Sequence, residues 1–185
     1  MKKIISGKIV YLRNLNISDI DNGWLKWVNN REVTMHMPYL KRQNKKGLIK
    51  YLRENKLPRS KIFAICLKSN NTHIGNARIS AIDKKNKTAS YGRLIGEKKL
   101  WEKGIGTETL NLMCIYAFDY LKITKLYGGV TPDNIGSKKS GFNVGATIEG
   151  TWKDHVVING KVLDVELISI LKKNFKRKYA VKHWK

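Results

Sequence analysis

The order of hydrophobic patterns along the chain predicts an α+β fold built around one mixed sheet. Patterns with helical spacing come early, at residues 18–30 and 44–55. Consecutive strand-like runs follow, joined by polar turns, and a strand, a helix and further strands come after them. Helices and strands grouped in this way are typical of α+β domains. At 185 residues the chain is long enough for one such domain with its own core.

The first half of the chain is expected to hold one strand and two helices. Residues 8–13 are expected to form the first strand. Ser18 is a suitable N-cap for the helix at 18–30. A polar loop at 33–43 leads to the second helix at 44–55, which ends before a proline.

The second half is expected to consist mostly of strands. These are expected at 62–67, 73–82, 88–96, 125–130, 147–158 and 161–171. A helix at 106–121 carries apolar residues along one face, and a shorter helix is expected to begin at Asn134. Asn159-Gly160 favours a type I′ turn and therefore predicts that the last two strands form a hairpin.

The chain is strongly basic, with 37 Lys and Arg against 14 Asp and Glu and a formal net charge of +23. Such a surface attracts nucleic acid, acidic membranes or phosphorylated small molecules. Lys, Asn and Ile are abundant, a bias that a genome rich in A and T can produce, so we expect no specific nucleic-acid partner. No apolar run is long enough to span a membrane and no signal-peptide core is present, so we expect a cytoplasmic protein without membrane insertion.

Two other features of composition bear on the organisation of the chain. Cys66 and Cys114 lie in apolar runs, and we interpret them as reduced core residues rather than as a disulfide or metal ligands. Residues 172–185 hold seven Lys or Arg and no acid. We therefore expect a domain at 1–171 and a solvated basic tail at 172–185, with a nucleic-acid- or phosphate-binding extension as the alternative.

Two glycines, Gly104 and Gly106, stand where a predicted strand passes into the helix at 106–121. A glycine lets a ligand lie directly on the backbone, and the start of a helix has free N–H groups that attract phosphate. The spacing matches neither the P-loop, which needs Gly-Lys-Ser/Thr, nor the dinucleotide fingerprint, which needs a third glycine. These residues alone leave open a phosphate site or a plain tight turn before a core helix.

This block resembles the acyl-CoA-binding motif of the GNAT superfamily of N-acetyltransferases, Gln/Arg-x-x-Gly-x-Gly/Ala, with Trp101 at the Gln/Arg position. Further stretches resemble, in the right order, parts of the branch that holds ribosomal-protein and amino-sugar N-acetyltransferases. They are Trp27-Val28-Asn29 with Glu32-Val33-Thr34, His73-Ile74-Gly75-Asn76, Asn134-Ile135-Gly136-Ser137 followed by Glu149-Gly150, and Lys153-Asp154-His155 with Asn159-Gly160-Lys161.

The resemblance implies a single domain with a mixed, mostly antiparallel sheet that splays apart between its fourth and fifth strands. It also implies helices on both faces of the sheet and acetyl-CoA as the cofactor, bound in the V between the splayed strands. Backbone groups of Leu94, Ile95 and Gly96 would bind the pantetheine arm and the carbonyl. The pyrophosphate would be held by the turn that comprises Glu102, Lys103, Gly104, Ile105, Gly106 and Thr107.

The resemblance places Asn134 and Ser137 at the acceptor and thioester end of the site. Ser137 would donate to the leaving thiolate and Asn134 would orient the amine or a water, although both residues could equally cap a helix. The tyrosine acid and the glutamate base that are customary in the family are replaced by Gly141 and Ser90. His36 and His155 are therefore the candidates for an acid or base, because histidine titrates near neutral pH.

The acceptor is expected to be a primary amine, most simply an amino sugar on a nucleotide carrier, which the C-terminal hairpin and the basic surface favour. Trp27, His36 and Tyr39 are expected to line its pocket, although packing of a loop against the core explains the two aromatic residues equally well. The alternatives are a protein N-terminus or another small amine, and, from another class, a basic RNA-contacting module without catalysis. A homodimer is compatible with the sequence, which does not fix the oligomeric state.

Overall fold

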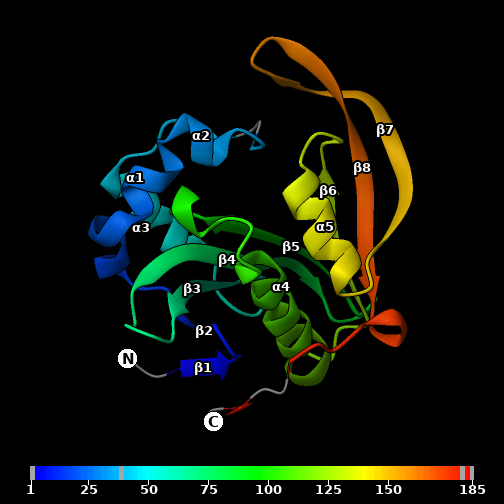
Figure 1. Cartoon of the computed structure of the whole chain (residues 1–185), viewed down its shortest axis with the longest axis horizontal. Coiled ribbons are helices and arrows are strands. Elements are labelled where there is room, and N and C mark those ends of the chain that lie inside the picture. Colours follow the sequence, from blue (N-terminus) through cyan, green and yellow to red (C-terminus); the bar gives the residue numbers. More distant parts are fainter. Residues whose placement is uncertain (1–2, 38–39, 180–181, 184–185) are drawn as a thin grey trace.

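In the part of the chain that the computed structural model describes, residues 3–37, 40–179 and 182–183, nine strands form one sheet (Figure 1). Their order is β7-β8-β6-β5-β4-β3-β2-β1-β9. The strands are β1 (Lys3–Ser6), β2 (Val10–Asn14), β3 (Lys61–Leu67), β4 (His73–Asp83), β5 (Thr88–Ile95), β6 (Lys125–Val130), β7 (Thr147–Ile158), β8 (Lys161–Leu171) and β9 (Lys182–His183). Neighbouring strands are antiparallel except β5 and β6, which run parallel. The predicted mixed, mostly antiparallel sheet is confirmed.

Helices cover both faces of this sheet, as predicted. The helices are α1 (Leu25–Val28), α2 (Arg31–Thr34), α3 (Lys45–Glu54), α4 (Ile105–Ile115) and α5 (Ile135–Asn143), with short 3-10 or π turns at Ile17–Asp19, Ile20–Trp24, Lys98–Leu100, Tyr116–Tyr120 and Lys172–Asn174. On β3, Phe63 and Ile65 belong to the core that contains α4. The intervening Ala64 packs on the other face with Trp24 and Leu48, because alternate strand residues point to opposite sides. Figure 1 shows α1, α2 and α3 together at one end of the sheet.

The first predicted helix is broken where the sequence suggested a continuous element. Gly23 has φ of 115°, and the helical backbone is interrupted there before α1 begins. A Cβ on Gly23 would lie 2.6 Å from the ring of Trp27, so the glycine lets this ring fold back against the chain. The first turn begins at Ile17, after Asn16, and Ser18 is not its cap. The second predicted helix is observed as α3, where the side chain of Asn44 accepts a hydrogen bond from Gly47 N–H.

α4 is buried on every side, which the one-sided apolar stripe did not predict. Besides its apolar residues, Glu108, Thr109 and Asn111 are fully buried. The carboxylate of Glu108 accepts hydrogen bonds from the N–H groups of Ile9 (2.6 Å) and Val10 (2.9 Å), which lie at the start of β2. This contact fixes the first turns of α4 to the far end of the sheet.

The described part of the basic C-terminal segment is anchored to the fold, while the Lys and Arg side chains at 172–178 are exposed to solvent. The ring of Phe175 packs on that of Phe118, with centroids 5.4 Å apart. Lys176 donates its N–H to Val144 O (3.0 Å) and accepts a hydrogen bond from the Asn111 side chain (3.3 Å). β9 then pairs with β1 at the edge of the sheet. The high charge of this segment predicted a solvated tail, but Phe175 and the backbone of the segment make contacts with the rest of the fold.

The sheet opens between β5 and β6. These are the fourth and fifth of the predicted strands, because β1 was not predicted, so the splay lies where it was expected. Only Thr88, Ala89 and Ser90 of β5 pair with β6. Beyond Ser90 the two strands part, and β6 continues in a ladder with β8. The last two strands form the predicted hairpin, which extends beyond α5 in Figure 1. Its turn residues Asn159 and Gly160 both have positive φ, as a type I′ turn requires.

Two further observations complete the fold. Cys66 and Cys114 are buried and free. No helix within the described ranges is long and apolar enough to cross a membrane.

Candidate active site

The opening between β5 and β6 is bordered by backbone groups at the end of β5. Gly96 N–H donates to Ile74 O on β4 at 2.8 Å. Because successive residues of a strand direct their peptide groups to opposite sides, those of Ile95 face the opening. The indole N–H of Trp101 donates to Ile95 O at 3.0 Å. Ile95 N–H therefore faces the V, whereas Gly96 N–H, predicted to bind the cofactor, is used inside the sheet.

In the part of the chain that the structure describes, the turn before α4 leaves several backbone N–H groups without a hydrogen-bond partner. The first hydrogen bond of the helix runs from Glu108 N–H to Gly104 O (2.9 Å), so the N–H groups of Ile105, Gly106 and Thr107 precede the intrahelical ladder. Gly104 has φ of 77° and provides no capping side chain, and a Cβ at this position would meet no atom within 4 Å. An open cradle at the positive end of a helix dipole fits a phosphate group.

Gly106 faces neighbouring elements of the fold, whereas Lys103 is exposed to solvent. A Cβ on Gly106 would lie 3.2 Å from Ser140 Oγ on α5 and 3.7 Å from Arg93 Nε on β5. This glycine therefore allows α4, α5 and β5 to approach each other, in addition to presenting its N–H group. Lys103 and Glu102 are exposed on the turn, and Glu102 has a positive φ of 61°.

At the start of α5, the capping interpretation of Asn134 is observed directly. Its side-chain oxygen accepts a hydrogen bond from Ser137 N–H at 3.2 Å. Ser137 is half-buried in the first turn of the helix, and its hydroxyl makes no hydrogen bond within the described residues. Gly141, one turn later, is buried, and a Cβ there would come within 2.9 Å of Ile168 on β8. The customary tyrosine is thus absent, and Ile168 occupies the space beside its position.

The two candidate histidines occupy different environments. His36, which follows α2, places Nδ1 3.3 Å from Thr131 Oγ1 and 3.6 Å from Asp133 Oδ1, in the loop between β6 and α5. His36 thus connects the segment after α2 to the loop that precedes Asn134. His155 is exposed on β7, with its ring 4.4 Å from that of Trp152. The structure therefore brings His36 to the opening between the two halves of the sheet.

Trp27 does not line an open pocket, which corrects the prediction. The residue is 3% exposed. Its ring packs edge-on against His73 at 4.9 Å, and its indole N–H donates to Glu97 Oε1 at 3.2 Å. Trp27 is therefore a core residue that packs against the end of β5 on the sheet face opposite to α4. Tyr39, the other aromatic candidate, lies outside the described residues.

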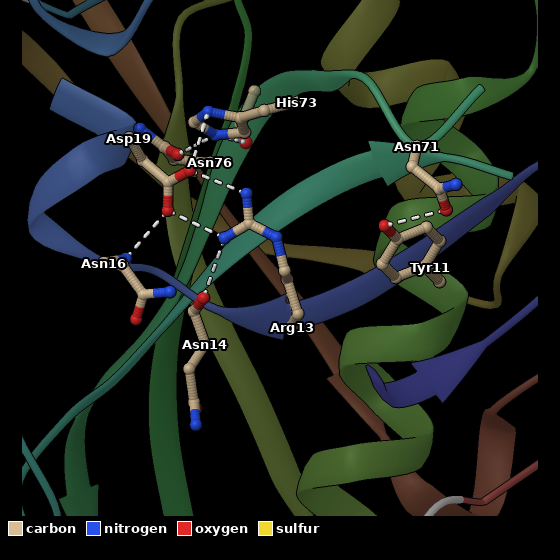
Figure 2. Close-up of polar contacts among 9 residues, drawn as sticks. Tyr11, Arg13, Asn14, Asn16, Asp19, Asn71, His73 and Asn76 are labelled. Atoms are coloured by element: carbon tan, nitrogen blue, oxygen red, sulfur yellow. Dashed lines mark hydrogen bonds and ion pairs between the residues drawn. The ribbon is translucent and has the colours of Figure 1, made fainter. Parts of the chain in front are cut away.

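Figure 2 shows a buried polar network that the sequence did not reveal, formed around Arg13, Asp19 and His73. The guanidinium of Arg13 on β2 donates hydrogen bonds of 2.7 and 2.6 Å to the two oxygens of Asp19. The ring of His73 on β4 lies 3.6 Å from the same carboxylate. Asp19 ends the first helical turn, so the network fixes the start of the segment that carries Trp27 to β2 and β4.

Burial and charge set the protonation of this network. Burial opposes the ionised form of Asp19, but hydrogen bonds from Arg13 and from Asn16 N–H outweigh it and lower the pKa of this carboxyl. Burial lowers the pKa of His73, although the nearby carboxylate of Asp19 favours its charged form. Arg13 and Asp19 therefore form a charged pair beside a histidine that is more easily neutralised than usual.

Comparisons with known proteins agree with this geometry. Residues 10–147 match the family model described as Acetyltransferase (GNAT) domain. An uncharacterized N-acetyltransferase p20 from Bacillus licheniformis is 26% identical over 168 residues, covering 89% of this chain and 93% of the relative. The probable N-acetyltransferase YjcK from Bacillus subtilis is 25% identical over 175 residues, covering 91% and 97%.

Solved structures share the fold at lower identity. A spermidine N-acetyltransferase from Vibrio cholerae, in complex with CoA and spermine, superimposes with a TM-score of 0.82 at 20% identity, covering 89% of this chain and 96% of that one. RimJ from Mycobacterium smegmatis, in complex with CoA-disulfide, gives a TM-score of 0.80 at 17% identity, covering 91% and 87%. With its splayed sheet, its free amides before α4 and the family match over residues 10–147, the chain belongs to the GNAT acetyltransferase family and is an acyltransferase that uses acetyl-CoA.

Proposed function

We propose that this chain transfers an acetyl group from acetyl-CoA to the primary amine of an anionic small molecule, namely an amino sugar on a nucleotide carrier. The family match supports acetyl transfer to an amine. The choice of acceptor rests on charge. The formal net charge of +23, from 37 basic and 14 acidic residues, attracts a substrate with phosphate groups and repels a polycation.

The observation that carries this choice is the pairing of carboxylates on the elements around the opening. Glu32 on α2 is 3.2 Å from Lys98, and Glu166 on β8 is 2.7 Å from Lys138 on α5. On the hairpin, Asp164 is 2.8 Å from Lys153. A polyamine needs free carboxylates for its several ammonium groups, and lysines of the chain already neutralise these three. Among the described residues, Asp133 beside His36 and Glu97 beside Trp27 have no lysine partner.

The residues of the chain take the following roles in this proposal. The N–H groups of Ile105, Gly106 and Thr107 bind the pyrophosphate, and Ile95 N–H faces the pantetheine arm. Bound acetyl-CoA supplies an activated thioester carbonyl. His36 accepts the proton of the amine directly or through one water. The carboxylate of Asp133 orients its ring, as a second group commonly does for a catalytic base.

A second candidate acceptor is a polyamine. The specific observation in its favour is the TM-score of 0.82 to a spermidine N-acetyltransferase that binds spermine. At 20% identity this likeness concerns the fold, and the positive charge of the present chain opposes a polycation.

The test is a thiol-release assay with acetyl-CoA and a panel of amines, at low and at moderate ionic strength. The panel contains nucleotide-linked amino sugars, free amino sugars, spermidine, spermine and a peptide with a free N-terminus. We expect the lowest KM for a nucleotide-linked amino sugar, with a KM that rises with salt as screening weakens the attraction. A lower KM for spermidine at both ionic strengths would overturn the proposed acceptor.

A further inference from the structure

Arg93, on β5 beside the opening, extends from the strand towards α4 and α5. It is three residues beyond Ser90, where the pairing of β5 with β6 ends. Its Nη2 lies 3.5 Å from Ser137 O on α5, and its Nε lies beside Gly106 on α4. Arg93 shares its face of the sheet with Tyr91 and Ile95, because alternate strand residues point the same way. Three elements of the site therefore surround one guanidinium.

This cation has no counter-charge in the described ranges 3–37, 40–179 and 182–183. Its contact with Ser137 O is long, and it forms no ion pair there. Burial raises the pKa of Tyr91 to about 12 and also raises the pKa of Cys114 on α4, so both neighbours are neutral at physiological pH. On the side of α5, Glu166 is held by Lys138.

An unpaired charge in such a place is costly. Burial lowers the pKa of Arg93, but a guanidinium stays protonated in proteins. Arg93 is half-buried, so its guanidinium is partly desolvated, and a partly desolvated charge without a partner is unfavourable. The free N–H groups before α4 add further positive potential close by. The arrangement therefore favours an anion beside the guanidinium of Arg93 when the ligands are bound.

The depth of Arg93 in the V indicates which anion this is. The turn that fits the pyrophosphate follows the end of β5, at the open side of the V. Arg93 is two residues nearer than Ile95 to the closed side, a distance of about 7 Å along a strand. A ligand whose phosphates lie at the turn and whose arm follows Ile95 has its sulfur end directed towards Arg93 and Ser137. At this end Gly141 offers no phenol to donate a proton.

We propose that Arg93 stabilises the thiolate that leaves during acetyl transfer and so replaces the missing proton donor. This inference rests on the proposed function. In the step, the amine nitrogen bonds to the carbonyl carbon, the carbon–sulfur bond breaks, and its electron pair stays on sulfur beside the guanidinium. The proton of the amine passes to the base or to water. A fixed positive charge placed where negative charge develops lowers the barrier because no solvent has to reorganise.

The test measures ionisation of the thiol of bound CoA and needs no acceptor. The ultraviolet absorbance of the thiolate is followed against pH, with CoA saturating, for the parent, Arg93→Met and Arg93→Lys. We expect the bound thiol of Arg93→Met to ionise at a pKa higher than in the parent by about 1–3 units, with Arg93→Lys in between. Once an acceptor is known, we expect kcat of Arg93→Met to fall by about 10²–10³.

Arg78→Met is the matched control. Arg78 lies on β4 opposite Gly92, next to Arg93 in the sheet, but it donates to the hydroxyl of Tyr51 on the other face (2.9 Å). This variant removes the same charge and should leave the bound thiol unchanged. Circular dichroism establishes that each variant is folded, and Arg93→Gln replaces Arg93→Met if the latter does not fold.

The outcomes separate this inference from the proposed function. If Arg93→Met binds CoA and its thiol ionises as in the parent, the role of Arg93 is wrong while acetyl transfer stands. Loss of CoA affinity with unchanged thiol ionisation would make Arg93 a phosphate ligand and would also overturn the inference. A parent protein that does not bind CoA would refute the proposed function itself.

Discussion

The indole ring of Trp27 lies directly against Gly96, so closely that a Cβ on this glycine would come within 2.0 Å of the ring. A residue of the first helical segment thus fixes the end of β5, whose backbone borders the cofactor site. The same tryptophan contacts His73, which adjoins the buried pair of Arg13 and Asp19. The site therefore depends on packing on the face of the sheet opposite to α4.

The contact between Trp27 and Gly96 leads to the first prediction. Gly96→Ala should destabilise the fold by about 1–3 kcal/mol, because overpacking forces the ring or the strand end to move, and it should weaken CoA binding. Urea unfolding and calorimetry with CoA measure the two effects. Gly92→Ala is the control, because a Cβ on Gly92 meets no atom within 4 Å. Equal CoA affinity in Gly96→Ala and the parent would show that Trp27 does not set the cofactor strand.

The turn before α4 gives a second prediction. Gly104→Val should lose CoA affinity, because it adds a branched side chain where phosphate approaches the backbone and costs about 1–2 kcal/mol for its positive φ. Gly160→Val carries the same strain, at φ of 76° with no atom within 4 Å of a Cβ, but lies in the hairpin turn. Calorimetry should show the affinity loss in Gly104→Val alone. Comparable losses in both variants would trace the effect to strain.

The catalytic residues give a third prediction. Ser137→Ala should slow turnover by about 10²–10³, because it removes a hydroxyl donor to the developing charge. The loss should exceed that of His36→Ala or His155→Ala. His155 is exposed, so a large loss confined to His155→Ala would contradict this arrangement.

The buried network gives a prediction for acid stability. Because the pKa of His73 is lower in the folded state than its usual 6.5, the unfolded chain binds more protons as the pH falls below that value. The free energy of unfolding should therefore decrease below about pH 6.5, by at most about 1.4 kcal/mol per pH unit. The lowered pKa of Asp19 adds a further decrease at more acidic pH.

Urea unfolding at a series of pH values measures this decrease. His73→Gln should flatten the slope between about pH 6.5 and 5, whereas His155→Gln, at an exposed position, should retain it. An unchanged slope in His73→Gln would assign the pH dependence to other groups.

The C-terminal segment gives the last prediction. Phe175→Ala should lower the free energy of unfolding by about 1–3 kcal/mol, because its half-buried ring packs on Phe118. Lys178→Ala, at an exposed position of the same segment, should leave stability nearly unchanged. Urea denaturation compares the two variants. Equal free energies of unfolding for Phe175→Ala and Lys178→Ala would indicate that the segment is a solvated tail.

The elements whose signals are local were predictable from the sequence. Strand-like runs bounded by polar turns predicted the strands from β3 to β8, and Asn159-Gly160 predicted the hairpin turn. The helix after Gly104 was predicted by its apolar spacing, and the start of α5 by the capping side chain of Asn134. The splayed sheet and acetyl-CoA followed from resemblance, since no local pattern specifies where two strands part.

Other features depend on contacts between distant parts of the chain. The sequence could not show that Gly23 breaks the first helix, because the cause is the ring of Trp27 folding back on it. Nor could it show that β1 and β9 extend the sheet, since such short strands exist only through their pairing. Arg93 gave no signal because an arginine within a strand is ordinary until the neighbours of its guanidinium are known.

The sequence by itself determined the class of fold, the order of the strands from β2 to β8 and the glycine turn before α4, since these depend on local periodicity and backbone freedom. Tertiary structure alone decided which side chains meet. It buried Trp27 under Gly96, brought His36 to Asp133, and placed Arg93, without a counter-ion among the described residues, between β5, α4 and α5. The physical reason is that burial and charge pairing are properties of three-dimensional neighbours, which lie far apart along the chain.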